Sequence, residues 1–202
     1  MLNQNIGFSN TLRTRVIRAP QAPLAWRLRN ALRWGFIWGF IANLLARGLT
    51  LLTGIPTITA ELRARVLRED GSVVDYGVLG RRVVTDVFVQ DVVDELVGTG
   101  TGISGYDYHA SGTGTTAEAA SNTALVTEVA TRTAGTPSEA APNIYQNQGT
   151  ISYTSSLAIT EHGLFDANAL GVLMDRTVFT AINVANGDSI QFTYQLTVNS
   201  GG

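Results

Sequence analysis

The chain has 202 residues, of which 45% are apolar and only 15% are charged, so it is long and apolar enough to bury one sizeable core. It contains no Cys and no Lys, which excludes disulfides, cysteine–zinc sites, thiolate nucleophiles, Schiff-base lysines and the lysine of a phosphate-binding P-loop. The net charge of −2 is divided unevenly, because residues 1–60 carry seven Arg and no acid, while the remainder carries seven Arg and all the acids.

This asymmetry predicts a basic N-terminal arm, residues 1–56, in front of a separate body, residues 57–202. Pro20 and Pro23 interrupt the arm, and residues 24–52 then have the pattern of a helix. The middle of that helix is apolar all round, which is typical of a helix covered by protein or lipid. Its uncharged stretch is shorter than the ~20 apolar residues of a membrane span, so we expect no transmembrane span, and no signal peptide is indicated.

A stripe of small residues in this helix, including Gly35 and Gly39, predicts close approach to another helix. We expect the surrounding aromatic side chains to bind a protein partner. A lipid surface is the second interpretation, and nucleic-acid contact through the arginines is possible but not favoured. Arginines that simply face solvent are the plainest alternative. The candidate interface residues on the arm are Trp34, Gly35, Phe36, Trp38, Gly39 and Phe40.

The body begins where the apolar period changes from 3.6 to 2, which predicts a half-buried strand from Ile58 to Val66. Asp70-Gly71 predicts a hairpin turn into a second strand. Residues 85–97 fit a short helix that covers one sheet, with Thr85 as its N-terminal cap and Gly98 at its end.

The rest of the body has the pattern of further strands separated by turns. We expect strands at residues 106–110, 123–132 and 172–184, and a loop at 133–142. Asn186-Gly187 predicts a hairpin between the long strand and the last one. Together these patterns predict a mainly β fold, an antiparallel β-sandwich or jelly-roll-like domain.

The last strand carries no charge on its outward face, although edge strands normally use charge to block pairing. We therefore expect this strand to be central in its sheet or to be covered by a neighbouring subunit. Its outward residues, all interface candidates, are Gln191, Thr193, Gln195 and Thr197.

Candidate chemistry is sparse. Residues 100–105 match G-x-G-x-x-G, but no strand precedes them and no helix follows, so a loop is favoured over a dinucleotide site. His109, His162 and Glu161 could form a metal site, although histidines in ordinary hydrogen bonds are favoured. Asp166 begins a sequence like a calcium loop, but the later ligand positions fail, and a turn stabilised by this residue is favoured. We predict no catalytic residue, no metal and no cofactor.

Glu161 and Arg176 are charged residues in an otherwise apolar region. If both are buried, an ion pair would satisfy each of them. We predict that this pair has a structural role.

Several segments resemble motifs of structural proteins in tailed-bacteriophage particles: residues 112–118, 122–125, 159–165, and 173–179 followed by 181–184 and 187–190. The resemblance covers roughly residues 80–200 and leaves the arm outside. A motif similar to residues 159–165 also occurs in tail-fibre and baseplate-attachment proteins. The resemblance implies a non-enzymatic virion protein and transfers no active-site residue.

Within a virion we expect a head decoration, cement or minor capsid protein that forms a homo-oligomer and contacts other virion proteins. A neck or tail component, such as an adaptor, fibre or baseplate-attachment protein, is the alternative location. Two other classes stay open. One is a membrane-surface binding module that uses the Trp/Arg helix, and the other is a small hydrolase or metal-dependent enzyme, for which the chain offers only His109 and His162.

Overall fold

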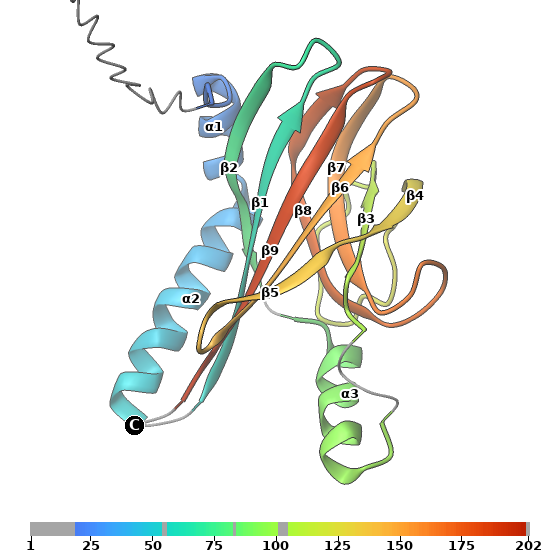
Figure 1. Ribbon diagram of the computed structural model, residues 1–202. Coiled ribbons are helices and arrows are strands. Elements are labelled where there is room, and N and C mark those ends of the chain that lie inside the picture. The colour runs from blue at the N-terminus through green and yellow to red at the C-terminus, as the bar shows by residue number, and fades with distance from the viewer. Residues whose placement is uncertain (1–18, 54–55, 83, 101–104, 201–202) are drawn as a thin grey trace, which may run out of the picture.

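The computed structural model describes residues 19–53, 56–82, 84–100 and 105–200 (Figure 1). The helices are α1 (Leu24–Ala31), α2 (Trp34–Thr53) and α3 (Asp86–Val97). The strands are β1 (Thr57–Leu67), β2 (Val73–Arg82), β3 (Tyr108–Gly112), β4 (Glu128–Ala134), β5 (Thr136–Ala141), β6 (Ile144–Ser152), β7 (Leu157–Phe165), β8 (Leu173–Val184) and β9 (Ser189–Asn199).

These strands form two antiparallel sheets, ordered β2-β1-β9-β6-β5 and β4-β3-β7-β8. The prediction of a mainly β, sandwich-like domain is therefore confirmed. Alternate side chains of both sheets point inward and form the core, as the period of 2 requires. Its largest fully buried apolar members include Phe179, Phe192, Leu62, Ile159 and Ile182.

Two local predictions are confirmed in detail. The Asp70-Gly71 turn joins β1 to β2, and Gly71 adopts the positive φ of 80° that such a turn needs. The helix α3 begins after Thr85, whose hydroxyl accepts a hydrogen bond from the Phe88 N–H, and it ends at Gly98 in the left-handed conformation.

The predicted Asn186-Gly187 hairpin is wrong. The chain does turn there, but β8 lies in the four-stranded sheet and β9 in the five-stranded sheet, so the two strands do not pair. Asp188 holds this crossing, because its carboxylate accepts hydrogen bonds from the Ala185 N–H and from Arg68 at the end of β1. A turn motif is local, whereas the partner of β9 is chosen by burial against β1 and β6.

The predicted loop at residues 133–142 is also wrong. Residues 136–141 form β5, an edge strand that pairs only with β6 among the described strands. Pro137 argued against a strand, but proline is tolerated at a sheet edge. The strand expected at 123–132 lies later, as β4, and the chain passes from one sheet to the other at Gly135.

The single helix predicted for residues 24–52 is two helices, separated by a turn at Leu32 and Arg33. The first, α1, closes the open side of the sandwich between β2 and β8. The Trp26 indole N–H donates to the Ala181 carbonyl at 2.8 Å, and the Asn30 side chain is buried between the two strands.

Asn30 bridges the sheet edges directly. Its amide nitrogen donates to the Leu79 carbonyl at 3.0 Å, and its amide oxygen accepts from the Thr180 N–H at 3.1 Å. One side chain therefore satisfies a backbone group on each edge, which stabilises both edges and blocks further pairing there.

The second helix, α2, lies beside β2 (Figure 1). Gly39 is buried at this contact, and a Cβ atom at this position would overlap the Arg81 carbonyl oxygen. The close approach that Gly39 permits is thus made to a strand of the same chain, whereas the sequence predicted approach to another helix. The prediction of a helix–helix contact at Gly39 needs this correction.

Candidate functional site

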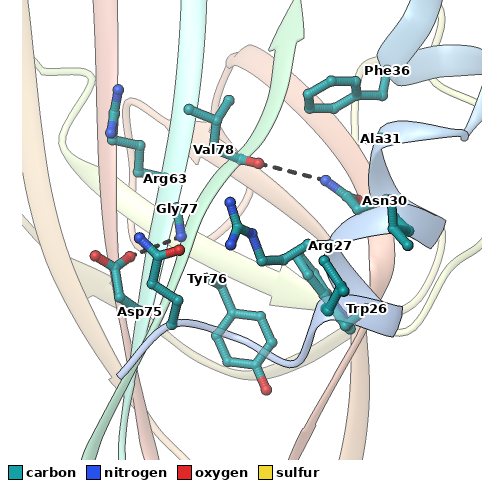
Figure 2. Close-up of a pocket in the computed structure, with 13 residues that line it drawn as sticks. Trp26, Arg27, Asn30, Ala31, Phe36, Arg63, Asp75, Tyr76, Gly77 and Val78 are labelled. Atoms are coloured by element: carbon teal, nitrogen blue, oxygen red, sulfur yellow. Dashed lines mark hydrogen bonds between the residues drawn. The ribbon is translucent and has the colours of Figure 1, made fainter. Parts of the chain in front are cut away.

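A pocket of about 460 Å³ lies between α1, the start of α2 and strands β1 and β2 (Figure 2). Its walls combine apolar side chains with opposite charges from the strands and from the helix. Its lining includes Leu24, Arg27, Leu28, Phe36, Asp75 and Tyr76. Figure 2 shows the Arg27 side chain extending from α1 over β2.

Among the described residues, the Arg27 guanidinium makes no hydrogen bond or ion pair. A cation beside apolar walls can bind an acidic group on a ligand or on a partner protein. Phe36, predicted as an interface residue, lines this same pocket and is half-buried within the chain.

The outer side of α2 presents large apolar side chains to solvent. Trp38 is 50% exposed and Phe40 is 53% exposed, and Leu44 and Leu45 are exposed to 62% and 66%. The other two arm candidates, Trp34 and Gly35, lie in α2, but their burial falls outside what the structure describes. That a partner protein buries this face stays a prediction. The exposed side chains form the surface that such a partner would bind.

The outer face of the five-stranded sheet is the second surface that the sequence predicted. β9 lies at its centre between β1 and β6, so of the two alternatives for this uncharged strand the central position is correct. Its four candidate residues, Gln191, Thr193, Gln195 and Thr197, are half-buried.

These residues form a polar ladder with β6. The Gln195 amide donates to Gln146 at 2.8 Å, and the Gln148 amide donates to the Thr193 hydroxyl at 3.0 Å. Arg63 of β1 lies opposite Thr193 in the sheet register, at a shallow hollow of about 230 Å³. The charge missing from β9 is thus supplied by its neighbour β1.

Inside the sandwich, the two histidines lie together. His109 Nδ1 is 2.9 Å from His162 Nε2, and His109 Nε2 is 3.0 Å from the Asn147 amide oxygen. The Asn147 amide nitrogen donates to the Tyr145 hydroxyl at 2.9 Å, and this hydroxyl donates to the Tyr106 carbonyl at 2.6 Å. These contacts form a chain of hydrogen bonds in which each group donates to the next and which ends at the Tyr106 carbonyl.

That direction assigns the tautomers, because the Asn147 oxygen must accept and so His109 carries its proton on Nε2. His162 then donates from Nε2, and its Nδ1 is a bare acceptor. Nδ1 is buried and has no hydrogen-bond partner among the described residues, in agreement with this assignment. Burial lowers the pKa of His109 to about 4; burial, with His109 nearby, lowers the pKa of His162 well below its ordinary value.

Two glycines make room for His109. A Cβ atom at Gly135 would overlap the Asn147 side chain, and a Cβ at Gly149 would overlap the His109 ring. The sequence grouped the two histidines only as a conceivable metal site, and nothing in it indicated that Asn147 and Tyr145 lie beside them. The glycines were the only local signal of a bulky polar group packed against backbone.

Both histidine side chains are fully buried, so no surface ligand reaches them in this conformation. Glu161 lies beside His162 in the chain, but adjacent residues of a strand face opposite ways, and its carboxylate points away from the imidazoles. Among the described residues, no group of three or more His, Asp or Glu could hold a metal ion.

Glu161 and Arg176 form the predicted ion pair, with a distance of 2.8 Å from the Arg176 guanidinium to the carboxylate. The carboxylate also accepts hydrogen bonds from the backbone N–H groups of Gly114, Val126 and Thr127. Burial alone would raise the pKa of Glu161, but these N–H groups and Arg176 outweigh it and lower the pKa.

Arg176 completes the clamp from the other side. It donates to the Thr116 carbonyl and to the Asn122 side chain, both at 3.1 Å. Residues 113–127 contain no helix or strand, so these bonds fasten an irregular segment to β7 and β8.

Asp166 stabilises a turn, as the sequence predicted. Its carboxylate accepts a hydrogen bond from the Val172 N–H at 2.6 Å, within the connection between β7 and β8. Residues 101–104 of the G-x-G-x-x-G motif lie outside the described residues. No helix in the described part of the chain has the length and apolar character needed to cross a membrane.

Comparison of the chain with protein-family models, curated proteins and solved structures found no match.

Proposed function

We propose that this protein is a non-enzymatic structural subunit of a tailed-bacteriophage particle and is located in the virion. In this proposal it is a head decoration, cement or minor capsid protein that assembles with copies of itself and with other virion proteins through its β domain. The N-terminal helices anchor it to a partner. A neck or tail position is the alternative within the same class.

The observation that carries the proposal is the outer face of α2. Trp38, Phe40, Leu44 and Leu45 are each at least half exposed, and no acidic residue occurs anywhere in this helix. Soluble monomers rarely expose contiguous apolar surface of this kind, because removing that surface from water is favourable and the molecules therefore associate. A subunit whose apolar face is permanently covered by a partner can carry such a surface, because the surface is not exposed to water in the assembly.

The interior supports a scaffold in a second way. Four of the segments that resemble virion proteins, residues 112–118, 122–125, 159–165 and 173–179, include both members of the Glu161–Arg176 pair and several of its hydrogen-bond partners. The resemblance therefore falls on residues that hold the fold together. This favours a shared architecture over a shared reaction.

Quantitative mass spectrometry of purified particles of the phage that encodes the chain tests the proposal. We expect the protein in the particle, and its copy number relative to the major capsid protein separates a head-lattice subunit from a neck ring. Trp38→Ser with Phe40→Ser should prevent incorporation. Val126→Ser, which alters an exposed apolar side chain elsewhere, should not.

Absence of the protein from particles would overturn the proposal. Flotation with anionic phospholipid vesicles tests the membrane-surface alternative with the same variants. Flotation of the wild type that is lost in the Trp38/Phe40 variant would favour that alternative, because those rings would then insert at the lipid interface.

A further inference from the structure

We propose that α1 of one copy of this chain binds α3 of a second copy, so that subunits join head to tail. This inference rests on the proposed role as an assembling subunit and specifies the contact between copies. It is carried by two helical surfaces with matching apolar stripes and opposite charge.

The surface on α1 is a leucine stripe. Leu24 and Leu28 lie one turn apart on one face of the helix, and Leu32, the capping residue that ends it, follows at the same spacing. They are exposed to 68%, 53% and 73%, while the opposite face buries Trp26 and Asn30 in the body. The leucines of α1 therefore lie on the face that points away from the body.

Arginines flank the leucine stripe. Arg27 and Arg29 are exposed, and among the described residues neither side chain has an ion-pair partner. No acidic residue occurs in α1. The complete surface is apolar along its middle and positive at its sides.

The surface on α3 has the opposite charge. Its exposed apolar residues are Val89 and Val93, each 46% exposed, with Leu96 at 83% and Val97 at 71%. Phe88 packs into the body from the other face. The helix contains four acids and no base, namely Asp86, Asp91, Asp94 and Glu95. Asp91 and Asp94 accept hydrogen bonds from the neutral side chains of Tyr106 and Gln90, so the helix keeps its negative charge.

The two stripes also match in length. Leu24 and Leu32 are eight positions apart, as are Val89 and Val97, which corresponds to about 12 Å along a helix. The pocket of about 460 Å³ adjoins the α1 stripe, because Leu24 and Leu28 line it and Arg27 extends over it (Figure 2). α3 projects from the body (Figure 1), and Leu96 on this helix is 83% exposed, so its side chain is available to fill the pocket of a second copy.

One chain cannot make this contact with itself, since α1 and α3 lie at opposite ends of the molecule (Figure 1). A second copy supplies the missing helix and leaves one α1 and one α3 free at the ends. Such a heterologous contact closes into a ring or continues as a filament.

Charge-reversal variants of the full chain test the contact. Variant A carries Arg27→Glu and Arg29→Glu, and variant B carries Asp94→Arg and Glu95→Arg. Each changes exposed or half-exposed side chains outside the core, and circular dichroism verifies that each is folded. Glu139→Arg, on the exposed edge strand β5, is the matched control. Sedimentation across micromolar concentrations measures self-association.

We expect A alone and B alone to weaken self-association at least about tenfold, because like charges then meet across the contact. A mixture of A and B should assemble again with the two variants alternating, because α1 of B meets the native α3 of A, and the exchanged charges on α1 of A and α3 of B also attract. The variant that combines all four substitutions should assemble again, since its charges are exchanged. The Glu139→Arg control should assemble like the wild type.

Unchanged assembly of A alone or B alone, or no restored assembly in the mixture, would overturn the α1–α3 contact. Oligomers that persist in A and B would leave the proposed virion function intact and place the contact between copies elsewhere. A wild type that is monomeric at all concentrations, yet is incorporated into particles, would show that another virion protein covers α1 and would likewise overturn this inference alone.

Discussion

Glu161 and Arg176 lie on the adjacent strands β7 and β8 but are not direct partners in the register, in which Glu161 faces Val178 and Gly163 faces Arg176. The ion pair is therefore diagonal across the sheet. This offset lets the carboxylate reach the backbone of residues 114–127 while the guanidinium reaches Thr116 and Asn122. Two buried charges thus stabilise a segment that contains no helix or strand.

Removal of either charge should be costly. Glu161→Ala leaves the Arg176 charge buried without its partner, and we expect it to lower the free energy of unfolding by about 3–5 kcal/mol. Arg63→Ala is the control, because the Arg63–Glu61 pair is exposed and such pairs contribute about 0–1 kcal/mol. Denaturant titration measures both variants.

Hydrogen exchange should locate the loss. Amides of residues 113–127 should lose protection in the Glu161→Ala variant, whereas those of β1 should keep it. If the variant unfolds with nearly the wild-type free energy, the pair does not hold the segment.

Acid should destabilise the protein through its histidines. Both have depressed pKa values in the folded chain, to about 4 for His109, against about 6.5 in the unfolded chain, so unfolding takes up protons. Their contribution is complete above pH 6.5 and is lost as the pH falls toward 4. For His109 alone the shift corresponds to about 3 kcal/mol.

Denaturant titrations at a series of pH values test this expectation. His109 and His162 are the two histidines of the chain. A slope of the free energy of unfolding against pH between pH 6.5 and 4.5 therefore reports on these two residues. His162→Phe, which can pack on Phe192, should make the slope shallower. The lowered pKa of Glu161 acts in a more acidic range, because that carboxylate loses its contribution only as the pH falls through its own pKa. A wild-type slope near zero in the histidine range would contradict the buried neutral pair.

Two glycines of α2 should respond oppositely to the same substitution. A Cβ at Gly39 would overlap the Arg81 carbonyl oxygen, so Gly39→Ala should push α2 from β2 and cost about 1–3 kcal/mol. A Cβ at Gly48 meets nothing within 4 Å, so Gly48→Ala should stabilise the helix by about 0.5–1 kcal/mol. Thermal unfolding of the two variants compares them directly, and equal stability would be inconsistent with the packing of α2 on β2.

The outer face of β9 should matter for assembly and not for folding. Thr193→Arg with Thr197→Asp leaves the inward residues Phe192, Tyr194 and Leu196 untouched, so circular dichroism should not change. If a partner covers this face, the introduced charges are buried unpaired and association weakens. Thr154→Arg with Ser156→Asp, in the exposed connection between β6 and β7, is the control. Sedimentation that is the same for all three proteins would show that the β9 face is free in the assembly.

Features that depend on a few neighbouring residues were predictable from the sequence alone. The cap at Thr85, the end of α3 at Gly98 and the turn at Asp70-Gly71 each depend on local backbone preferences, and all three are present. The alternation of apolar residues predicted the sandwich, because a strand with one apolar face must bury that face. The isolated charges of Glu161 and Arg176 likewise predicted each other.

The tertiary structure decided everything that depends on distant partners. Asn186-Gly187 predicts a turn whichever strand follows, but β9 pairs with β1, which lies more than a hundred residues earlier in the chain, because both fill one side of the core. Pro137 disfavours a strand except at an edge, and the sequence does not show which strand is the edge. The His109–His162 contact requires that Ser111 face His162 in the β3–β7 register, and register is set by the packing of whole sheets. Local chemistry therefore determined the elements, and the burial of their apolar faces determined which of them meet.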